Sequence, residues 1–335
     1  MIRKMHPLKY FLGIDQGGTK TQAAVCAGDG TVIGAATGEP SIFYLDDPEN
    51  KSTLTVRRLA EKILADAGLA WGSLSAACGG LTGVDWPHEV PLHEERLRGK
   101  LNLTDVTAVN DCVIALRAGS SAPDRCIVCA GTGLNIAAHP SDGVEYVYGY
   151  FIPDYLQGGS ALGQAVIDAV TEAEAGVRPP TMLTDVLLSC SGCASVERFL
   201  TGKTTRKISF EPQSLVPGLL NAFSAGDDAA GQILGAFING VAGYIENALT
   251  RFFPPGRDTE LVYSGGVFKG GGRVITDAFT KTLSQKFPRL RFTNARLEPV
   301  CGALLMLLDR MYNGNIPGGV TANFEKGCTL HGLIR

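Results

Sequence analysis

Charge is scarce in this sequence and shows little bias toward either sign. Charged residues make up 19% of the 335 residues, and the formal net charge is -3. No stripe of basic residues is present, which argues against a nucleic-acid-binding protein. No long run of like charges is present either, which argues against a charged disordered tail. We therefore expect no nucleic acid among the partners.

Long apolar runs are missing as well. The longest strongly apolar stretch, "VCGALLMLLD", is far shorter than the roughly 20 residues that a membrane-spanning helix needs. Near the N-terminus, Arg3, Lys4 and Lys9 precede only the short run "FLGI" before Asp15, which is too little for the apolar region of a signal peptide. These absences predict a cytoplasmic protein without a membrane partner.

What the chain does have is apolar residues, length and glycine. Hydrophobic residues make up 45% of the sequence, and 42 of the residues are glycine. A chain of this length divides more readily into two domains than into one core. The abundant glycine predicts many tight turns or close approaches of the backbone.

The nine cysteines are expected to be reduced thiols, because most of them lie in apolar runs. Those in apolar runs are Cys26, Cys126, Cys129 and Cys301. Two C-x-x-C pairs, Cys126/Cys129 and Cys190/Cys193, leave a metal site open as an alternative. The first pair argues against it, because "CIVCAG" is typical of a buried strand, where residues i and i+3 face opposite sides.

A strand–turn–strand–turn–strand pattern occurs twice. The first copy is "YFLGID", "TQAAVCA" and "TVIGAAT", with glycine turns between the runs. The second is "RCIVCAGTGLNIAAHPSDGVEYVYGY", in which Gly131-Thr132-Gly133 takes the place of Gly17-Gly18-Thr19. Asp-Gly between apolar runs favours hairpins, so each copy predicts an antiparallel meander. Repetition of the meander indicates a duplicated domain, although glycine-rich turns can also recur by chance.

The first glycine turn is not a Walker A loop. Gly13 and Gly18 have the right spacing, but Thr19 stands where lysine is required, and a strand follows instead of a helix. The amide groups of such a hairpin turn can still form a concave site for anions.

Helices alternate with the remaining strands, which predicts an α/β fold. The stretch 52–68 places Leu54, Leu59, Ile63 and Ala67 on one stripe, with Ser52 as the expected N-cap. A later helix is expected to begin with Ser160 as its N-cap. Four strand ends carry small or polar residues, and ligands of α/β sheets bind at strand ends. These ends are Asp15–Thr19, Asn110-Asp111, Gly131–Gly133 and Ser264–Gly266.

Five motifs now carry a resemblance: "GIDQGGTKTQAAV", "GGLTGVDWP", "AVNDCVIAL", "AGTGLN" and "YSGGVFKGGG". The motifs occur in this order between residues 12 and 272. Through them the chain resembles the superfamily of acetate kinases, sugar kinases, heat-shock proteins and actin. Within it, the chain is similar to the BadF/BadG/BcrA/BcrD ATPase family, which includes N-acetylglucosamine kinases. The resemblance implies two actin-like (ribonuclease H-like) domains with ATP and Mg²⁺ in the cleft between them.

Site residues follow from the resemblance, motif by motif. It implies two phosphate loops, an adenosine site, a water-mediated magnesium ligand, a general base and a set of sugar contacts. The phosphate loops are Gly17, Gly18, Thr19, Lys20 and Gly131, Thr132, Gly133; the adenosine site is Gly265, Gly266 and Ala222; the magnesium ligand is Asp15; the base is Asp111; the sugar contacts are Asp85, Asn110 and Asn135. Plainer structural roles stay open for the three acids, since Asp111 can cap a helix and Asp15 and Asp85 can simply sit in turns.

The chain departs from the family at the acceptor site. Where the family reads G-D-E-G-S, this chain has Leu156-Gln157-Gly158-Gly159-Ser160, so both acids are gone. Gln157 and Gly158 take their places, and Asp154 is a further polar candidate. An asparagine expected after "PS" is replaced by Ile42. The phosphate machinery is intact, so the sequence predicts ATP more firmly than it predicts N-acetylglucosamine.

The leading hypothesis is an ATP-dependent kinase of an amino sugar or related sugar. Two alternatives remain: an ATPase activator of a radical dehydratase, with a cluster held by Cys190 and Cys193, and a non-catalytic sugar sensor. The expected domains are 1–117 and 118–310, with a helical insertion at 160–255 and a helix near 311–335 that packs back on the first domain. Hinges are expected near 115–120 and 305–312, and a homodimer is one option for the assembly.

Overall fold

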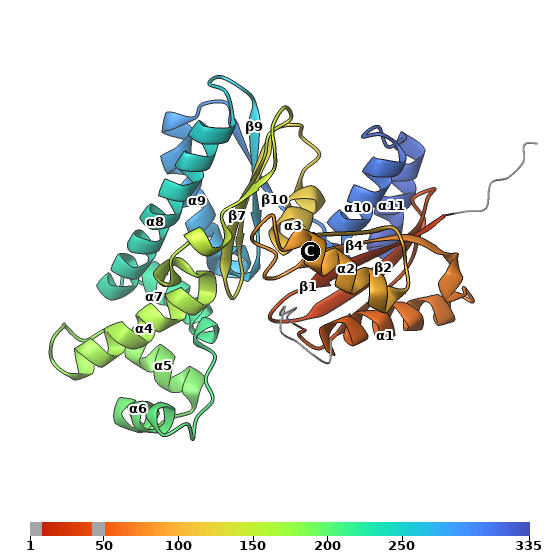
Figure 1. The fold of residues 1–335 in the computed structure, drawn as a ribbon. Coiled ribbons are helices and arrows are strands. Elements are labelled where there is room, and N and C mark those ends of the chain that lie inside the picture. The colour runs from red at the N-terminus through yellow and green to blue at the C-terminus, as the bar shows by residue number, and fades with distance from the viewer. Residues whose placement is uncertain (1–8, 42–50) are drawn as a thin grey trace, which may run out of the picture.

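Two five-stranded sheets form the two halves of the computed structural model, which describes residues 9–41 and 51–335 (Figure 1). The first sheet has the order β3-β2-β1-β4-β5. Its strands are β1 (Tyr10–Gln16), β2 (Thr21–Ala27), β3 (Val32–Gly38), β4 (Leu74–Leu81) and β5 (Val106–Asn110). The meander β1–β2–β3 is antiparallel, and β4 and β5 continue the sheet in parallel with β1.

The second sheet repeats this plan with the order β10-β9-β6-β7-β8. Its strands are β6 (Arg125–Ala130), β7 (Leu134–His139), β8 (Tyr146–Val147), β9 (Thr259–Ser264) and β10 (Leu290–Asn294). Again a three-stranded antiparallel meander is extended by two parallel strands. The predicted pair of meanders and the predicted α/β class with two actin-like halves are confirmed.

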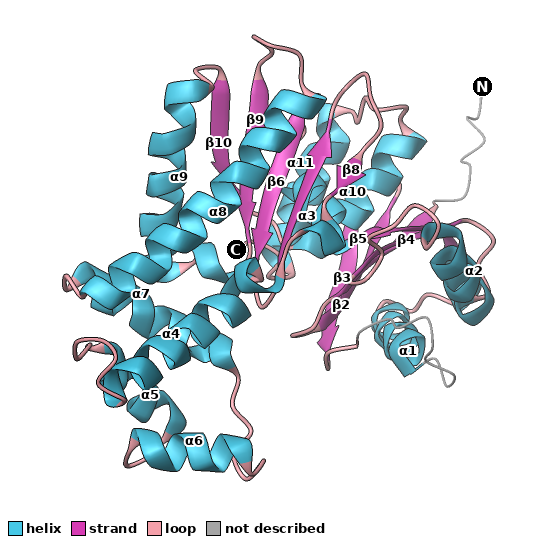
Figure 2. Cartoon of the chain, turned by 60° about the vertical axis from the view of Figure 1, so that its left-hand side comes forward, coloured by secondary structure: helices cyan, strands magenta, loops and turns pink. Residues whose placement is uncertain are grey.

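Helices cover both faces of each sheet. On the first sheet, α1 (Lys51–Asp66) and α2 (Val90–Leu101) pack on one side, while α10 (Pro299–Met311) packs on the other and α11 (Gly318–Leu330) contacts β3. On the second sheet, α8 (Asp228–Phe252) and α9 (Arg273–Lys286) cover the face opposite α3 (Asp111–Gly119) (Figure 2). Within the described ranges 9–41 and 51–335, no helix is both long and apolar enough to cross a membrane.

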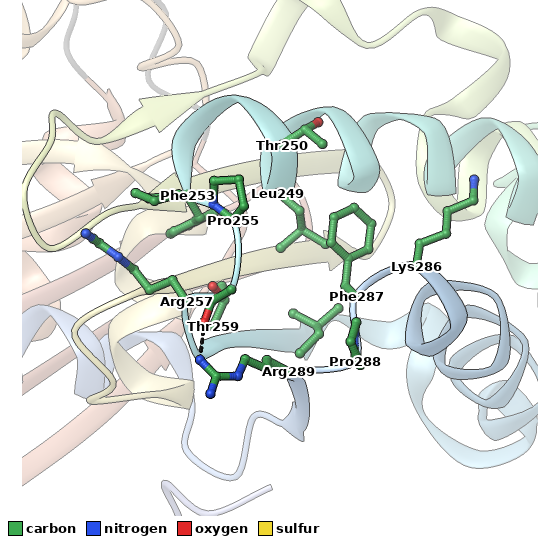
Figure 3. A pocket seen from close by; sticks show the side chains of 13 residues that line it. Leu249, Thr250, Phe253, Pro255, Arg257, Thr259, Lys286, Phe287, Pro288 and Arg289 are labelled. Atoms are coloured by element: carbon green, nitrogen blue, oxygen red, sulfur yellow. Dashed lines mark hydrogen bonds between the residues drawn. The ribbon is translucent and has the colours of Figure 1, made fainter.

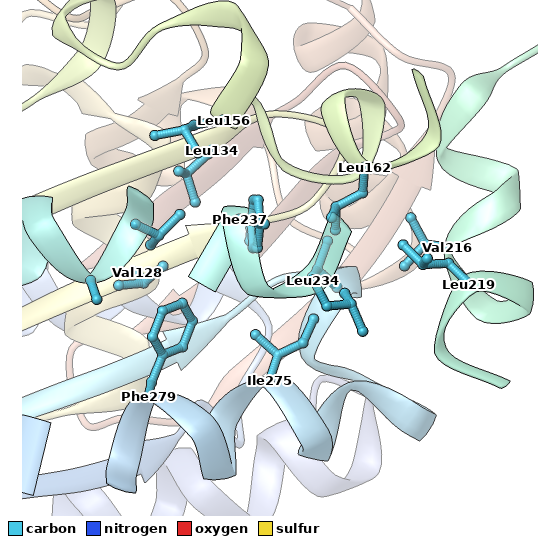
Figure 4. Close-up of a cluster of buried hydrophobic side chains, with 14 of the residues drawn as sticks. Val128, Leu134, Leu156, Leu162, Val216, Leu219, Leu234, Phe237, Ile275 and Phe279 are labelled. Atoms are coloured by element: carbon cyan, nitrogen blue, oxygen red, sulfur yellow. The ribbon is translucent and has the colours of Figure 1, made fainter. Parts of the chain in front are cut away.

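The insertion between β8 and β9 is helical. It contains α4 (Gly158–Glu174), α5 (Leu183–Ser191), α6 (Val196–Thr204), α7 (Val216–Ser224) and α8. Single 3₁₀ turns occur at Trp71–Ser73, Gly149–Phe151, Asp154–Leu156, Pro212–Leu215, Gly266–Phe268 and Gly270–Gly272. Side chains of α4, α7, α8 and α9 join the second sheet in one hydrophobic core, in which Phe237, Ile275 and Phe279 lie near Val128 (Figure 4).

The apolar stripe predicted for α1 is half right. Leu59 and Ile63 are buried as expected, together with Val56 and Ala60, and the helix packs on β2 and β3. Leu54 is 52% exposed, and Ala67 is exposed and lies just beyond the end of the helix. The side chain of Ser52, expected as the cap, lies outside the described part.

Helix α3 lies between the two sheets and is buried on nearly every side. Ile114 packs in the core of the first sheet with Phe11 and Val300. Val113 and Leu116 pack against strands of the second sheet in a separate cluster. A helix that is apolar on most of its faces needs such cover on each of them. Consequently the first residue of α3, Asp111, has a fixed position relative to both sheets.

The chain crosses between the halves after α3 and again between β10 and α10. Side chains of α10 pack mainly on β1, β2 and β4 and on α3. We therefore propose to assign 9–119 and 297–335 to the first domain and 120–296 to the second, in place of the expected boundary at 310. The stretch 305–312, expected as a hinge, is mostly the second half of a continuous helix.

Helices α3 and α10 approach most closely at Gly302. A Cβ atom on this glycine would lie 1.8 Å from the carbonyl oxygen of Ile114. We expect Gly302→Ala to force the helices apart and to destabilise the protein by about 1–3 kcal/mol, the usual cost of overpacking. Gly235→Ala in α8 is the matched control, because a Cβ there meets nothing within 4 Å and alanine favours a helix by about 0.5–1 kcal/mol. Denaturant unfolding measures both; equal midpoints for the two variants would contradict the packing argument.

Candidate active site

The first glycine turn connects β1 to β2 and faces the cleft between the sheets. The Gly17 amide donates to the carbonyl oxygen of Lys20 at 3.0 Å, which closes the turn. Gly18 and Thr19 are exposed at its tip, Gly17 is half-buried, and Thr19 and Lys20 line a cavity of about 660 Å³. The sequence thus placed this turn correctly at the cleft.

The second glycine turn connects β6 to β7 and is braced by the start of α4. The amide of Gly159 donates to the Gly131 carbonyl at 2.8 Å, and the amide of Ser160 donates to the Thr132 carbonyl at 2.9 Å. The helix begins at Gly158, so the prediction that Ser160 caps it is wrong. Gly158 has φ 48°, and a Cβ there would lie 2.2 Å from the Gly133 carbonyl oxygen. Only glycine permits this close approach.

The two turns meet across the cleft. The hydroxyl oxygens of Thr19 and Thr132 lie 3.2 Å apart, although the residues belong to different halves of the chain. Both threonines line the 660 Å³ cavity. A cavity between two glycine turns that carry threonine hydroxyls and backbone amides has the kinds of donor that a phosphate group requires.

The end of β9 forms another wall of this cavity. Gly265 has φ 108°, and a Cβ there would lie 2.2 Å from the Ala130 carbonyl oxygen. Gly265 and Gly266 both line the cavity, as the sequence predicted for the strand end. The remaining lining residues are Gly131, Gly159, Gln213, Val216, Pro217, Leu220, Asn221, Val267, Lys269, Gly271, Glu298 and Arg335.

Ala222 does not lie at the cavity. Its side chain is 3% exposed and packs in the core of the second half, whereas the neighbouring Leu220 and Asn221 line the cavity. The resemblance gave the correct turn of α7 but the wrong face of the helix. We therefore place the contact expected for a nucleotide base on Leu220 and Asn221.

Asp15 is a buried carboxylate at the end of β1. It pairs in register with Gly80 of β4, and Leu81 pairs with Asn110 of β5, so Asp15 and Asp111 share one sheet edge. Burial raises the pKa of Asp15 to about 7, and the charge of Asp111 adds to the rise. Two carboxylates that repel one another fit a divalent cation between them or nearby. The residues present therefore fit the expected magnesium ion, which Asp15 would bind through a water molecule.

Asp111 is the first residue of α3, but it is not the helix cap. The Asn110 side chain accepts the Cys112 amide at 2.9 Å and provides the cap. The Thr82 hydroxyl lies 2.8 Å from Oδ2 of Asp111 and holds the carboxylate in place. Burial raises the pKa of Asp111. The cap role that the sequence left open for Asp111 is thus taken by its neighbour.

Asp85, Asn110 and Asn135 form one hydrogen-bonded group across the two halves. Oδ1 of Asp85 accepts from Asn110 Nδ2 at 2.9 Å and from Asn135 Nδ2 at 3.1 Å. Burial raises the pKa of Asp85 to about 6, although its bond from Asn135 opposes the rise. The structure thus brings together the three polar residues that the sequence assigned to the acceptor.

The residues that replace the family's two acids are occupied elsewhere. The Gln157 side chain accepts the Leu134 amide and donates to the Ile152 carbonyl, both at 3.0 Å. Gly158 has no space for a side chain, as described above, and Asp154 is exposed. Gln157 and Gly158 therefore shape the second loop rather than offer free groups to an acceptor. Ile42, the other departure, lies outside the described residues.

An aromatic group that the sequence did not reveal begins at Trp86, directly after the acceptor residue Asp85. Trp86 stacks on Tyr150 with ring centroids 5.9 Å apart and meets Phe151 edge-on at 5.1 Å. Tyr150 and Phe151 are 63% and 54% exposed, and a Cβ atom on Gly149 would lie 2.6 Å from Oδ1 of Asp85. Only the fold brings these rings together, because Trp86 comes from the first half and its partners from the second.

A second cavity of about 460 Å³ lies at the far end of the second sheet, between the end of α8 and the turn before β10 (Figure 3). Its walls are largely apolar, with Leu249, Phe253 and Phe287 among them. The cations at its rim are paired with acids, for example Lys286 with Glu246 at 2.7 Å. It holds neither glycine turns nor a carboxylate pair, so it does not compete with the cleft as an active site.

The cysteines fit the expectation of reduced thiols. All nine are free, and six of them are buried. Cys190 is exposed and Cys193 is half-buried at the end of α5. Among the described residues, no three or more His, Cys, Asp or Glu side chains gather in a group able to hold a metal ion.

Comparisons with known proteins agree with this architecture. The chain is 24% identical over 316 residues to N-acetyl-D-glucosamine kinase of Dictyostelium discoideum, covering 89% of this chain and 98% of that protein. It is 23% identical over 311 residues to N-acetylmuramic acid/N-acetylglucosamine kinase of Clostridium acetobutylicum, again covering 89% and 98%.

Among solved structures, a candidate N-acetylglucosamine kinase from Chromobacterium violaceum superposes with a TM-score of 0.67 at 24% identity, covering 90% of this chain and 100% of that one. At this identity the likeness shows the fold alone. The model of the BadF/BadG/BcrA/BcrD ATPase family matches residues 12–306. The chain therefore belongs to the BadF/BadG/BcrA/BcrD ATPase family.

Proposed function

We propose that this protein is an ATP-dependent carbohydrate kinase, which phosphorylates a hydroxyl of an amino sugar or related sugar of the N-acetylglucosamine or glucosamine type. The observation that carries the proposal is the position of Asp111. Its carboxylate stands at the start of α3, beside the first glycine turn, while Asn110 provides the helix cap. A carboxylate with a raised pKa is a better proton acceptor near neutral pH than an ordinary one.

The chemistry assigned to these residues is proton removal and positioning. Asp111 takes the proton of the acceptor hydroxyl, and the Thr82 hydroxyl keeps the carboxylate aimed. The acceptor oxygen then forms a bond to the γ-phosphorus, the bond from this phosphorus to the bridging oxygen breaks, and ADP leaves with that oxygen. Amides of the two glycine turns bind the phosphate oxygens throughout.

Magnesium belongs to the proposal through Asp15. When bound, the ion neutralises charge on the phosphates. Asp15 would hold it through water, because the carboxylate is 8% exposed and lies at the same sheet edge as Asp111. Lys20 of the first turn lines the same cavity and adds a second positive charge for the phosphates.

The acceptor class is inferred from the relatives and from the polar group at the cleft. Both curated relatives are kinases of N-acetylated amino sugars by name. Asp85, Asn110 and Asn135 offer a carboxylate and two amides, which suit the hydroxyl and amide groups of such a sugar. A screen of ADP release over hexoses, amino sugars and N-acetylated sugars tests the class. Release with none of them, despite ATP binding, would favour the non-catalytic sensor.

The general base is tested by Asp111→Asn. Asparagine keeps the shape of the side chain but cannot accept the proton, so we expect turnover to fall by about 10²–10⁴, the usual worth of a positioned base. The melting temperature and the affinity for ATP should stay close to wild type, because neither the cap nor the glycine turns change. Asp228→Asn is the control, since Asp228 is an exposed acid of the second half that does not line the 660 Å³ cavity. Turnover of Asp111→Asn within a few fold of the control would assign the base to another residue.

The nucleotide site is tested at the end of β9. Gly265→Ala would push a methyl group into the Ala130 carbonyl and displace the wall of the cavity. We expect ATP to bind at least about tenfold more weakly, measured by calorimetry with and without Mg²⁺. Gly256→Ala is a matched control, because Gly256 also has a positive φ (78°) but a Cβ there meets nothing within 4 Å. Both variants carry backbone strain of about 1–3 kcal/mol, so only loss of affinity specific to Gly265→Ala supports the site.

A further inference from the structure

Residues 331–335 return from α11 to the junction between the two halves. The Glu298 amide donates to the Leu333 carbonyl at 2.8 Å, and the Arg335 amide donates to the Arg296 carbonyl at 2.7 Å. Leu297 and Ile334 form an antiparallel bridge between these two bonds. The segment thus pairs with the stretch that links β10 to α10, and the marker C lies between the two halves in Figure 1.

This pairing fixes the Arg335 side chain at the floor of the cleft. The guanidinium donates from Nη1 to the Ser264 hydroxyl at 2.7 Å, and its Nε lies 3.3 Å from Oε1 of Glu298. Its side chain is only 14% exposed, and it lines the same 660 Å³ cavity as the two glycine turns. A buried guanidinium is costly unless it meets negative charge.

The carboxylate of Glu298, which pairs with Arg335, is shared with a second cation. The other carboxylate oxygen of Glu298, Oε2, lies 2.7 Å from Nζ of Lys20 in the first glycine turn. One carboxylate therefore serves two cations, and the side chains of Lys20, Glu298 and Arg335 together carry one net positive charge, which also acts on the carboxyl group of Asp15. A guanidinium carries five N–H donors in a planar fork, which is more than these two contacts use.

From this geometry we propose that Arg335 binds the phosphates of the nucleotide together with Lys20, while Glu298 positions both cations. Guanidinium and phosphate match as a planar fork and a set of anionic oxygens, which makes the bond strong and directional. The inference rests on the proposed nucleotide site. It adds a binding residue from a segment that lies outside residues 12–306, the part matched by the family model.

A competing explanation is that Arg335 is only a structural tie. Its bond to Ser264 at the end of β9 joins the second half to the junction segment, and such a tie would matter for stability alone. The two roles differ in what they do to ligands with and without phosphate. A tie affects all ligands of the cleft alike, whereas a phosphate contact affects only phosphorylated ones.

The test is calorimetry on the full chain with Arg335→Gln, using ATP with Mg²⁺, ADP in EDTA, and adenosine. We expect at least about tenfold weaker binding of ATP and ADP, and adenosine affinity within twofold of wild type. Metal-free ADP is included because the charge of Arg335 also acts on Asp15, so an effect through the magnesium site would vanish in EDTA. Arg296→Gln is the control, because Arg296 is exposed and only its backbone takes part in the pairing.

Arg335→Lys is a second variant that tests the same contact if Arg335→Gln does not fold. Lysine keeps the charge and the apolar stem but loses the fork, so we expect a loss of about threefold for ATP and none for adenosine. Unchanged ATP and ADP affinity in the Arg335 variants, or equal losses for ADP and adenosine, would overturn the inference. Wild-type protein that binds ATP in an Arg335-dependent way but phosphorylates no sugar would contradict the kinase proposal and leave this inference standing.

Discussion

Burial of α3 between two sheets is the constraint on which the cleft depends. Ile114 packs into the first half, and Val113 and Leu116 pack into the second. The contact with α10 at Gly302 leaves no room for a side chain. Because α3 cannot shift without opening both cores, Asp111 at its first turn holds a fixed place beside the first glycine turn. A surface helix would not fix a carboxylate in this way.

The two halves share one plan but use it differently. Both glycine turns follow the first strand of a meander, and their threonines meet at 3.2 Å. The first turn is followed by Lys20, which brings a cation to the cavity. The second turn is braced by amides from the start of α4, a helix that the first half lacks. The two halves thus have similar glycine turns, and only the second turn is held by hydrogen bonds from the helical insertion.

Local patterns in the sequence were enough to predict the meanders, the glycine turns and the strand end that leads to Asp111. Glycine, alternation and turn residues act over a few positions, so their signals are readable without a fold. Predictions from the sequence failed where a residue's role depends on which face of a helix it occupies or on a partner far away in the chain. Ala222 turned to the core because one helical position separates it from Asn221. Ser160 lost its expected role because its amide meets the Thr132 carbonyl. No local pattern links Arg335 to Ser264, which lies 71 positions earlier.

The place of α10 in the fold has a consequence for synthesis on the ribosome. Strands β1, β2 and β4 emerge early, but the helix that covers Phe11, Ala24 and Cys78 comes from residues 299–311. The second half, by contrast, is formed from one continuous stretch. Its core can fold first. One apolar face of the first sheet stays exposed until nearly the whole chain has been made. Aggregation of nascent chains is therefore most dangerous at that face, where a chaperone has most to protect.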